Sequence, residues 1–224
     1  MSGRKAAERQ PLHFMTSPKT YVYVDAFNLY YGCVKGTPNK WLNIRCLCEI
    51  MLPQNQIVKI KYFTARVNAR PSDPQAPIRQ QVYLRALETL PNLSIVYGHF
   101  LSHVVTMPVA NPVPNQPKYV EVIKTEEKGS DVNLATHLLN DAYQSKYDIA
   151  VVVSNDSDLL APIQIVKGPL GKTIGILNPQ KRPSRELLKE ASFFKTIRPN
   201  TLAKAQFPKI LRDAHGEIHK PSGW

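Results

Sequence analysis

The sequence predicts a single α/β domain whose mostly parallel central sheet is flanked by helices. Apolar runs of strand length alternate with stretches of helical periodicity along most of the chain, which is typical of βαβ units. The chain has 224 residues, 43% of them hydrophobic and 21% charged. A chain of this length and composition can bury one sizeable core without disulfides.

The first half of the chain contains two expected strands and three expected helices. Residues 20–27, TYVYVDAF, are rich in β-branched and aromatic side chains, as buried strands are. A short helix over 27–34 and a second over 43–52 follow. The segment 57–67 alternates and then becomes continuously apolar, which suits a strand in a covered sheet. The segment 78–90 has apolar residues at near-helical spacing and ends before a proline.

The middle of the chain is predicted to hold two further strands, a loop and a long helix. The strands are expected over 93–101 and 119–128. Four prolines in 107–117 exclude regular structure there and indicate an exposed loop. Residues 130–144 form an amphipathic helix, with Ser130 as the expected N-cap.

The remaining elements complete the alternation. Residues 147–156, YDIAVVVSND, form the clearest central strand, and a helix follows over 157–166. Two more strands are expected over 172–178 and 193–197. These elements place one domain at 20–200.

Two basic segments flank that domain. Residues 1–19 are expected to be a flexible basic N-terminal arm, and residues 201–224 a basic, weakly structured C-terminal tail. The N-terminus has no apolar stretch of a secretory signal, and no apolar run approaches the ~20 residues that cross a bilayer. Three cysteines form no disulfide framework. The expected location is therefore the cytoplasm, with no membrane partner.

The charges are unevenly distributed. The formal net charge is +12, but residues 119–158 carry eight acids against three bases. A basic surface attracts polyanions, whereas an acidic cluster within it repels them unless a cation lies between. A bound Mg²⁺ or Mn²⁺ fulfils that role, and a solvated acidic face is the alternative explanation.

Four aspartates are expected at the carboxyl edge of the sheet, where functional groups gather in parallel α/β folds. Asp25 ends the first strand, Asp156 and Asp158 follow the central strand, and Asp131 begins the helix over 130–144. Mg²⁺ and Mn²⁺ prefer carboxylate oxygens, so all four are candidate metal ligands and catalytic residues. Each also has a simpler explanation as a helix cap or first-turn acid.

Four polar residues beside these aspartates are candidate substrate contacts. Asn28 lies one helical turn after the first aspartate, and Lys128 stands three residues before Asp131. Ser154 and Asn155 precede the acidic pair and offer hydroxyl, amide and backbone donors. Lys128 suits a contact with a phosphate, and an ordinary solvated lysine is the alternative.

Three segments together resemble the NYN domain family of the PIN-like nuclease superfamily: YVDAFNLYYG, EEKGSDVNLATHLL and VVVSNDSDLLAPI. The closing DAHGEIHKPSGW resembles the tail of bacterial members. The resemblance covers about residues 20–200 and implies a Rossmann-like PIN fold that cleaves RNA, single-stranded RNA being the expected partner, with Mg²⁺ or Mn²⁺. It assigns the acidic roles to Asp25, Asp131, Asp156 and Asp158.

The resemblance has one departure and leaves alternatives. Many relatives carry a further aspartate in the motif helix where this chain has His137, which is a metal ligand, a phosphate contact or a loss. A non-catalytic RNA-binding or adaptor module is therefore a second hypothesis. Small-molecule or toprim-like phosphoryl chemistry on the same fold is a third. The oligomeric state stays open, a homodimer included.

Overall fold

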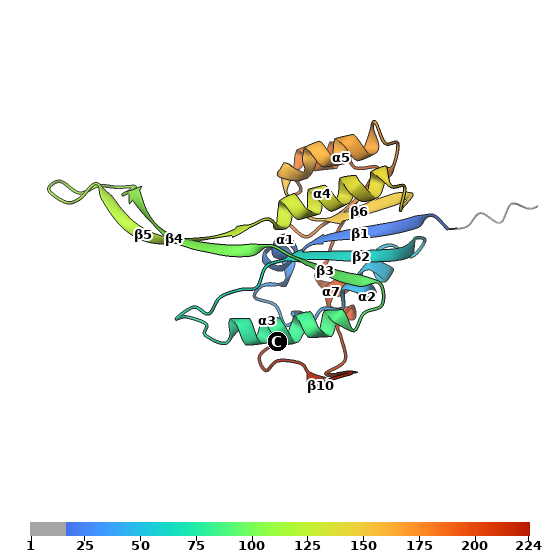
Figure 1. Cartoon of the computed structure of the whole chain (residues 1–224), viewed down its shortest axis with the longest axis horizontal. Helices are drawn as coiled ribbons and strands as arrows, with labels where there is room; N and C mark the ends of the chain where they lie inside the picture. Colours follow the sequence, from blue (N-terminus) through green and yellow to red (C-terminus); the bar gives the residue numbers. More distant parts are fainter. Residues whose placement is uncertain (1–16) are drawn as a thin grey trace, which may run out of the picture.

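The computed structural model describes residues 17–224, and a six-stranded sheet forms its centre (Figure 1). The strands lie in the order β3-β2-β1-β6-β7-β8. Every neighbouring pair is parallel. Their bounds are β1 (Lys19–Asp25), β2 (Gln56–Thr64), β3 (Leu93–Tyr97), β6 (Ile149–Val153), β7 (Thr173–Asn178) and β8 (Phe193–Thr196). This confirms the predicted α/β fold with a parallel central sheet, as in PIN-like proteins.

Helices cover both faces of the sheet because successive strand residues alternate between them. On one face, Val22 and Val24 pack with α2 (Ile44–Met51), α3 (Ala76–Glu88) and α7 (Pro199–Lys204). On the other, Tyr23 packs with α4 (Ser130–Tyr143), α5 (Leu160–Lys167) and α6 (Arg185–Glu190). The sheet is thus buried from both sides, as its continuously apolar strands predict.

The strand order reverses at the centre of the sheet. From β1 the chain proceeds to β2 and β3 on one side, and later returns to β6, β7 and β8 on the other. A crevice opens at such a switch point beyond the carboxyl ends of the two central strands. Two short elements begin there: α1 (Ala26–Leu29), which continues as η1 (Tyr30–Val34), and η2 (Ser157–Leu159).

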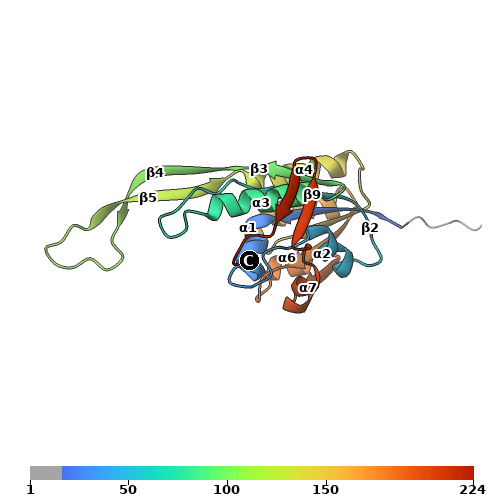
Figure 2. The ribbon, with the colours of Figure 1, turned by 90° about the horizontal axis from the view of Figure 1, so that it is seen from below.

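A long antiparallel ribbon projects from the body, as Figures 1 and 2 both show. It consists of β4 (His99–Pro108) and β5 (Tyr119–Lys128), which pair along ten residues each. The prediction of a single strand over 93–101 is wrong, because the strand is interrupted at Gly98, between β3 and β4. The expected loop over 107–117 is displaced slightly, since β4 continues to Pro108 and the connection spans 109–118. The prolines therefore mark the tip of a ribbon.

The C-terminal segment 201–224 is part of the folded domain, so its expected description as weakly structured is wrong. It contains the end of α7 and a hairpin of β9 (Ile210–Asp213) and β10 (Gly216–His219). Long-range contacts hold it in place. Ile218 is buried, the Trp41 indole N–H donates to the Pro208 carbonyl at 2.7 Å, and Arg85 pairs with Asp213.

The expected N-terminal arm falls almost wholly outside the described residues, which begin at residue 17. Within 17–224, none of the helices has both the length and the apolar character needed to cross a bilayer.

Candidate functional site

Asp25 lies at the switch point, where β1 ends. The strand before it is apolar on both faces and buries the carboxylate, which is only 5% exposed. Its Oδ1 accepts the backbone N–H of Asn28 at 2.9 Å, and its Oδ2 accepts the hydroxyl of Ser154 at 2.9 Å. Asp25 is therefore the N-cap of α1 as well as a candidate site residue, and it joins the ends of β1 and β6.

The segment after β6 continues this hydrogen-bond network. The Ser154 hydroxyl oxygen accepts the N–H of Asp156 at 3.1 Å, and Oδ1 of Asp156 accepts the N–H of Asp158 at 3.0 Å. The N–H of Asn155 donates to Oδ1 of Asn28 at 3.1 Å. Ser154 thus joins the Asp25 carboxylate to the backbone of Asp156, and Asn155 joins the same segment to Asn28, which makes them positioning residues.

Asp131 reaches the site from α4. The expected Ser130 N-cap is wrong, because Gly129, in the left-handed region at φ 96°, precedes the helix as its N-cap. The Glu127 carboxylate caps the helix from outside, accepting the N–H and the hydroxyl of Ser130 at 3.1 and 2.6 Å. This arrangement needs Gly98, since a Cβ there would lie 2.6 Å from the Lys128 carbonyl oxygen and 3.0 Å from the Ser130 nitrogen.

The carboxylates share one electrostatic neighbourhood. Burial, together with the charges of Asp131 and Asp156, raises the pKa of Asp25 to about 6, although the hydrogen bonds from Asn28 and Ser154 lower it. Loss of hydration, followed by the charge of Asp156, also raises the pKa of Asp131. Glu127 and Asp158 contribute to the same upward shift. Residues more than a hundred positions apart therefore repel one another at this edge.

An open hollow of about 590 Å³ adjoins these residues on the β6–β7 side; we call it the groove. Asn28, Asn155 and Asp156 line it together with Lys181 and Arg182, which follow β7. The side chain of Asn155 holds the segment after β7, because its amide nitrogen donates to the Arg182 carbonyl at 3.0 Å. Sequence reasoning missed these two cations, although a basic pair directly after a strand end was the available signal.

Lys128 and His137 lie apart from this network. The Lys128 ammonium is half exposed and pairs with Glu126 at 3.3 Å, at the base of the ribbon. The His137 ring lies against Phe63, with Nδ1 3.0 Å from the ammonium of Lys61, which in turn pairs with buried Asp141. Burial lowers the pKa of His137, and the Lys61 charge lowers it further. The histidine therefore belongs to a network between β2 and α4.

The donor chemistry at the edge fits a hard cation in an open site. Within residues 17–224, His, Cys, Asp and Glu side chains form no group of three or more spaced to hold a metal ion. Mg²⁺ keeps several waters and is usually held by one or two carboxylates together with substrate phosphates. Asp25 and Asp156 suit that arrangement, since a cation would relieve the repulsion that raises the Asp25 pKa. The predicted set of four ligands stays a prediction.

Comparisons with known proteins identify relatives of this chain. The sequence profile of the NYN domain matches residues 19–198. The 6-hydroxy-3-succinoylpyridine 3-monooxygenase HspA of Pseudomonas putida is 30% identical over 237 aligned residues, covering 92% of this chain and 75% of that protein. A crystal structure of a protein of unknown function from Vibrio parahaemolyticus has a TM-score of 0.53 at 16% identity, covering 86% of this chain and 98% of that one. That last likeness shows the fold alone.

We expect the substitution Gly98→Ala to destabilise the fold by about 1–3 kcal/mol, as overpacking does. The added Cβ meets two backbone atoms of the segment that leads into α4. Chemical unfolding measures the loss. The matched control is Gly171→Ala, where a Cβ meets no atom within 4 Å and only the φ of 62° is unfavourable, at about 1 kcal/mol. A smaller loss for Gly98→Ala than for this control contradicts the close approach.

As the pH rises from about 4 to about 6, the free energy of unfolding of the metal-free protein should fall because of Asp25. Its pKa is raised from 3.8 to about 6 in the folded state, so the unfolded chain releases this proton first as the pH rises. The shift corresponds to at most about 3 kcal/mol. We therefore expect Asp25→Asn to be more stable than the parent at pH 7–8 in the presence of a chelator, with the difference vanishing below about pH 4. Unfolding free energies of both proteins across this range test it, and equal stability at neutral pH contradicts it.

Proposed function

Because the chain belongs to the NYN domain family, we propose that it is a metal-dependent ribonuclease acting at the carboxyl edge around Asp25. The observation that supports this most directly is the buried Asp25 carboxylate at the end of β1 in an otherwise basic protein, where burial and then the charges of Asp131 and Asp156 raise its pKa. Such a group of carboxylates is unfavourable when empty and becomes favourable beside a divalent cation. NYN nucleases are generally divalent-metal dependent and act on RNA.

The residues around the edge have different roles in the proposed reaction. Asp25 and Asp156 hold the cation, with Asp131 beside them and Asp158 as an outer partner. Bound there, Mg²⁺ or Mn²⁺ supplies a water of lowered pKa and neutralises charge on the phosphodiester. Ser154 holds the Asp25 carboxylate and the backbone of Asp156 through its two hydrogen bonds.

The groove supplies the contacts for the RNA backbone. Lys181 and Arg182 line it opposite the carboxylates and attract phosphate oxygens. Among residues 17–224, the side-chain nitrogen of Asn28 has no hydrogen-bond acceptor, so it is available to a phosphate. The hollow is open, which suits a single strand whose bases stay outside. Lys128 contacts the RNA further along, at the base of the ribbon.

We expect the purified protein to cleave single-stranded RNA with Mn²⁺ and to lose activity with a chelator. Asp25→Asn and Asp156→Asn should each lower the rate by about 100-fold or more, the usual cost of removing a group that positions charge in the reaction. A matched control is Asp148→Asn at the amino end of β6, where the side chain only accepts the N–H of Lys19. Cleavage by Asp25→Asn at the parental rate would falsify the assignment. Cation binding without cleavage would favour the adaptor hypothesis.

A second candidate function is chemistry on a small aromatic molecule. It is favoured by one observation, the 30% identity to a protein named 6-hydroxy-3-succinoylpyridine 3-monooxygenase over nearly the whole chain. A monooxygenase inserts one atom of O₂ and reduces the other to water, so it needs two electrons from a cofactor. The fold permits such a change of role, because one fold carries many activities.

Oxygen uptake distinguishes this second candidate. The purified protein is incubated with 6-hydroxy-3-succinoylpyridine, a flavin and a reduced nicotinamide. For a ribonuclease we expect no uptake beyond that of the cofactors alone. Uptake that depends on the pyridine, together with absent RNA cleavage, replaces the first proposal with the second.

A further inference from the structure

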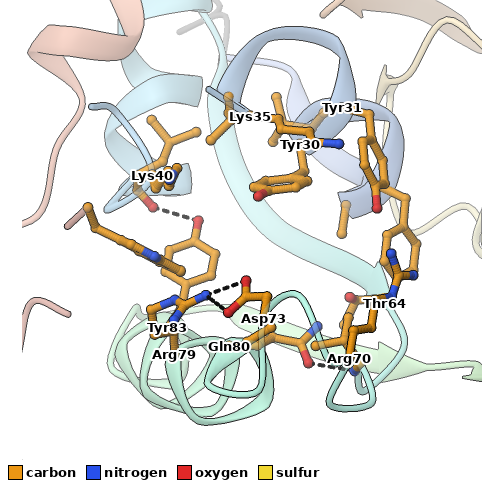
Figure 3. Close-up of a pocket in the computed structure, with 18 of the residues that line it drawn as sticks. Tyr30, Tyr31, Lys35, Lys40, Thr64, Arg70, Asp73, Arg79, Gln80 and Tyr83 are labelled. Carbon is orange, nitrogen blue, oxygen red and sulfur yellow. Dashed lines mark hydrogen bonds and ion pairs between the residues drawn. The ribbon is translucent and has the colours of Figure 1, made fainter. Parts of the chain in front are cut away.

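A cavity of about 410 Å³ lies on the opposite side of α1 and η1 from the groove. Figure 3 shows Tyr30, Tyr31 and Lys35 of the η1 region on one side of it, and Asp73, Arg79 and Gln80 on the facing side. Its volume is in the range that holds small ligands, about 300–1,000 Å³. Neither proposed function assigns this cavity a role.

The lining carries an excess of positive charge. Lys35, Lys40, Arg70 and Arg79 contribute cations, whereas Asp73 is the one acidic side chain among the lining residues. The Asp73 carboxylate already forms an ion pair, since both of its oxygens lie 2.6 Å from a guanidinium nitrogen of Arg79. Within residues 17–224, no carboxylate forms an ion pair with the other three cations. The cavity is therefore arranged to receive an anion.

Aromatic rings form much of the remaining wall. Tyr30 and Tyr31 meet edge to face, with centroids 5.2 Å apart, and the Lys35 ammonium lies 4.9 Å from the Tyr31 ring. Phe27, Tyr62 and Tyr83 also line the cavity. Flat rings with exposed faces suit a planar ring, through stacking, and the nearby cation adds to that attraction.

The two sides of the cavity lie within electrostatic reach of each other. Burial raises the pKa of Tyr30, and the charges of Arg79 and Asp73 on the facing side act on it as well. One lining residue, Tyr62, lies close to the site, because it pairs with Val24 on the neighbouring strand, one residue before Asp25. A ligand in the cavity can thus contact rings and cations together while lying behind the carboxylate edge.

We propose that this cavity binds a small planar aromatic anion, with the ring against Tyr30 and Tyr31 and the negative group held by Lys35, whose ammonium lies 4.9 Å from the Tyr31 ring (Figure 3). The recognised chemistry is one aromatic ring with one carboxylate or phosphate. Two sources supply it, a free aromatic acid and a mononucleotide. The ribonuclease proposal needs no ligand on this side of α1, whereas a free aromatic acid is also the substrate class of the second candidate function.

The test is a calorimetric titration of the whole protein in the presence of a chelator. The two probes are pyridine-3-carboxylate and adenosine 5′-monophosphate. Pyridine-3-carboxamide keeps the ring without the charge, and inorganic phosphate keeps the charge without the ring. We expect at least one aromatic anion to bind about tenfold more tightly than both controls, as a charge-assisted hydrogen bond provides. Binding of the carboxylate alone identifies a free acid as the ligand, and binding of the nucleotide alone identifies a mononucleotide.

Two variants locate the binding. Lys35→Gln should weaken it by about tenfold, whereas Arg182→Gln in the groove should leave it unchanged. The proposal is overturned when neither aromatic anion binds, when the controls bind equally well, or when Arg182→Gln weakens binding as much as Lys35→Gln. RNA cleavage does not enter the measurement, so this outcome is independent of the ribonuclease proposal.

Discussion

The buried carboxylate of Asp25 constrains the rest of the site. Two hydrogen bonds, from the N–H of Asn28 and the hydroxyl of Ser154, tie it to α1 and to the end of β6. They do not offset its lost hydration and the charges of Asp131 and Asp156, so its pKa stays raised at about 6. The metal-free edge therefore holds unfavourable free energy that a bound cation relieves. A side chain that only capped α1 would not need burial among other acids.

Two features of the fold create this neighbourhood. The reversal of strand order between β1 and β6 brings Asp25, at the end of β1, close to the segment after β6 that carries Asp156. The third carboxylate arrives differently, because Gly98 lets the base of the ribbon lie against the start of α4. The ribbon therefore has a structural role beyond its exposed tip. Its base fixes the position of Asp131.

The sequence was most informative where a local pattern determined the structure. Apolar runs located the sheet strands, and because carboxyl ends of parallel strands share an edge, Asp25, Asp156 and their neighbours could be grouped before any coordinates. Contacts across the chain were not visible in this way. The hydrogen bond from the Trp41 indole to the Pro208 carbonyl holds a C-terminal segment that has little helical or strand periodicity of its own. Lys61 on β2 contacts His137 and so connects it to the Asp141 network. Of the ribbon, the strand over 119–128 was predicted, whereas β4 was missed because the strand expected over 93–101 was carried across Gly98.

The groove and the cavity lie on opposite sides of α1 and η1, and Asp25 is connected to lining residues of both. It shares a network with Asn28 and Asn155, which line the groove, and its charge acts on Tyr62, which lines the cavity. The two hollows share α1 and η1 as a common wall but have no lining residue in common. A fold arranged in this way can change the ligand of one hollow while the residues of the other stay in place, which is compatible with a relative named as a monooxygenase within a nuclease-like family.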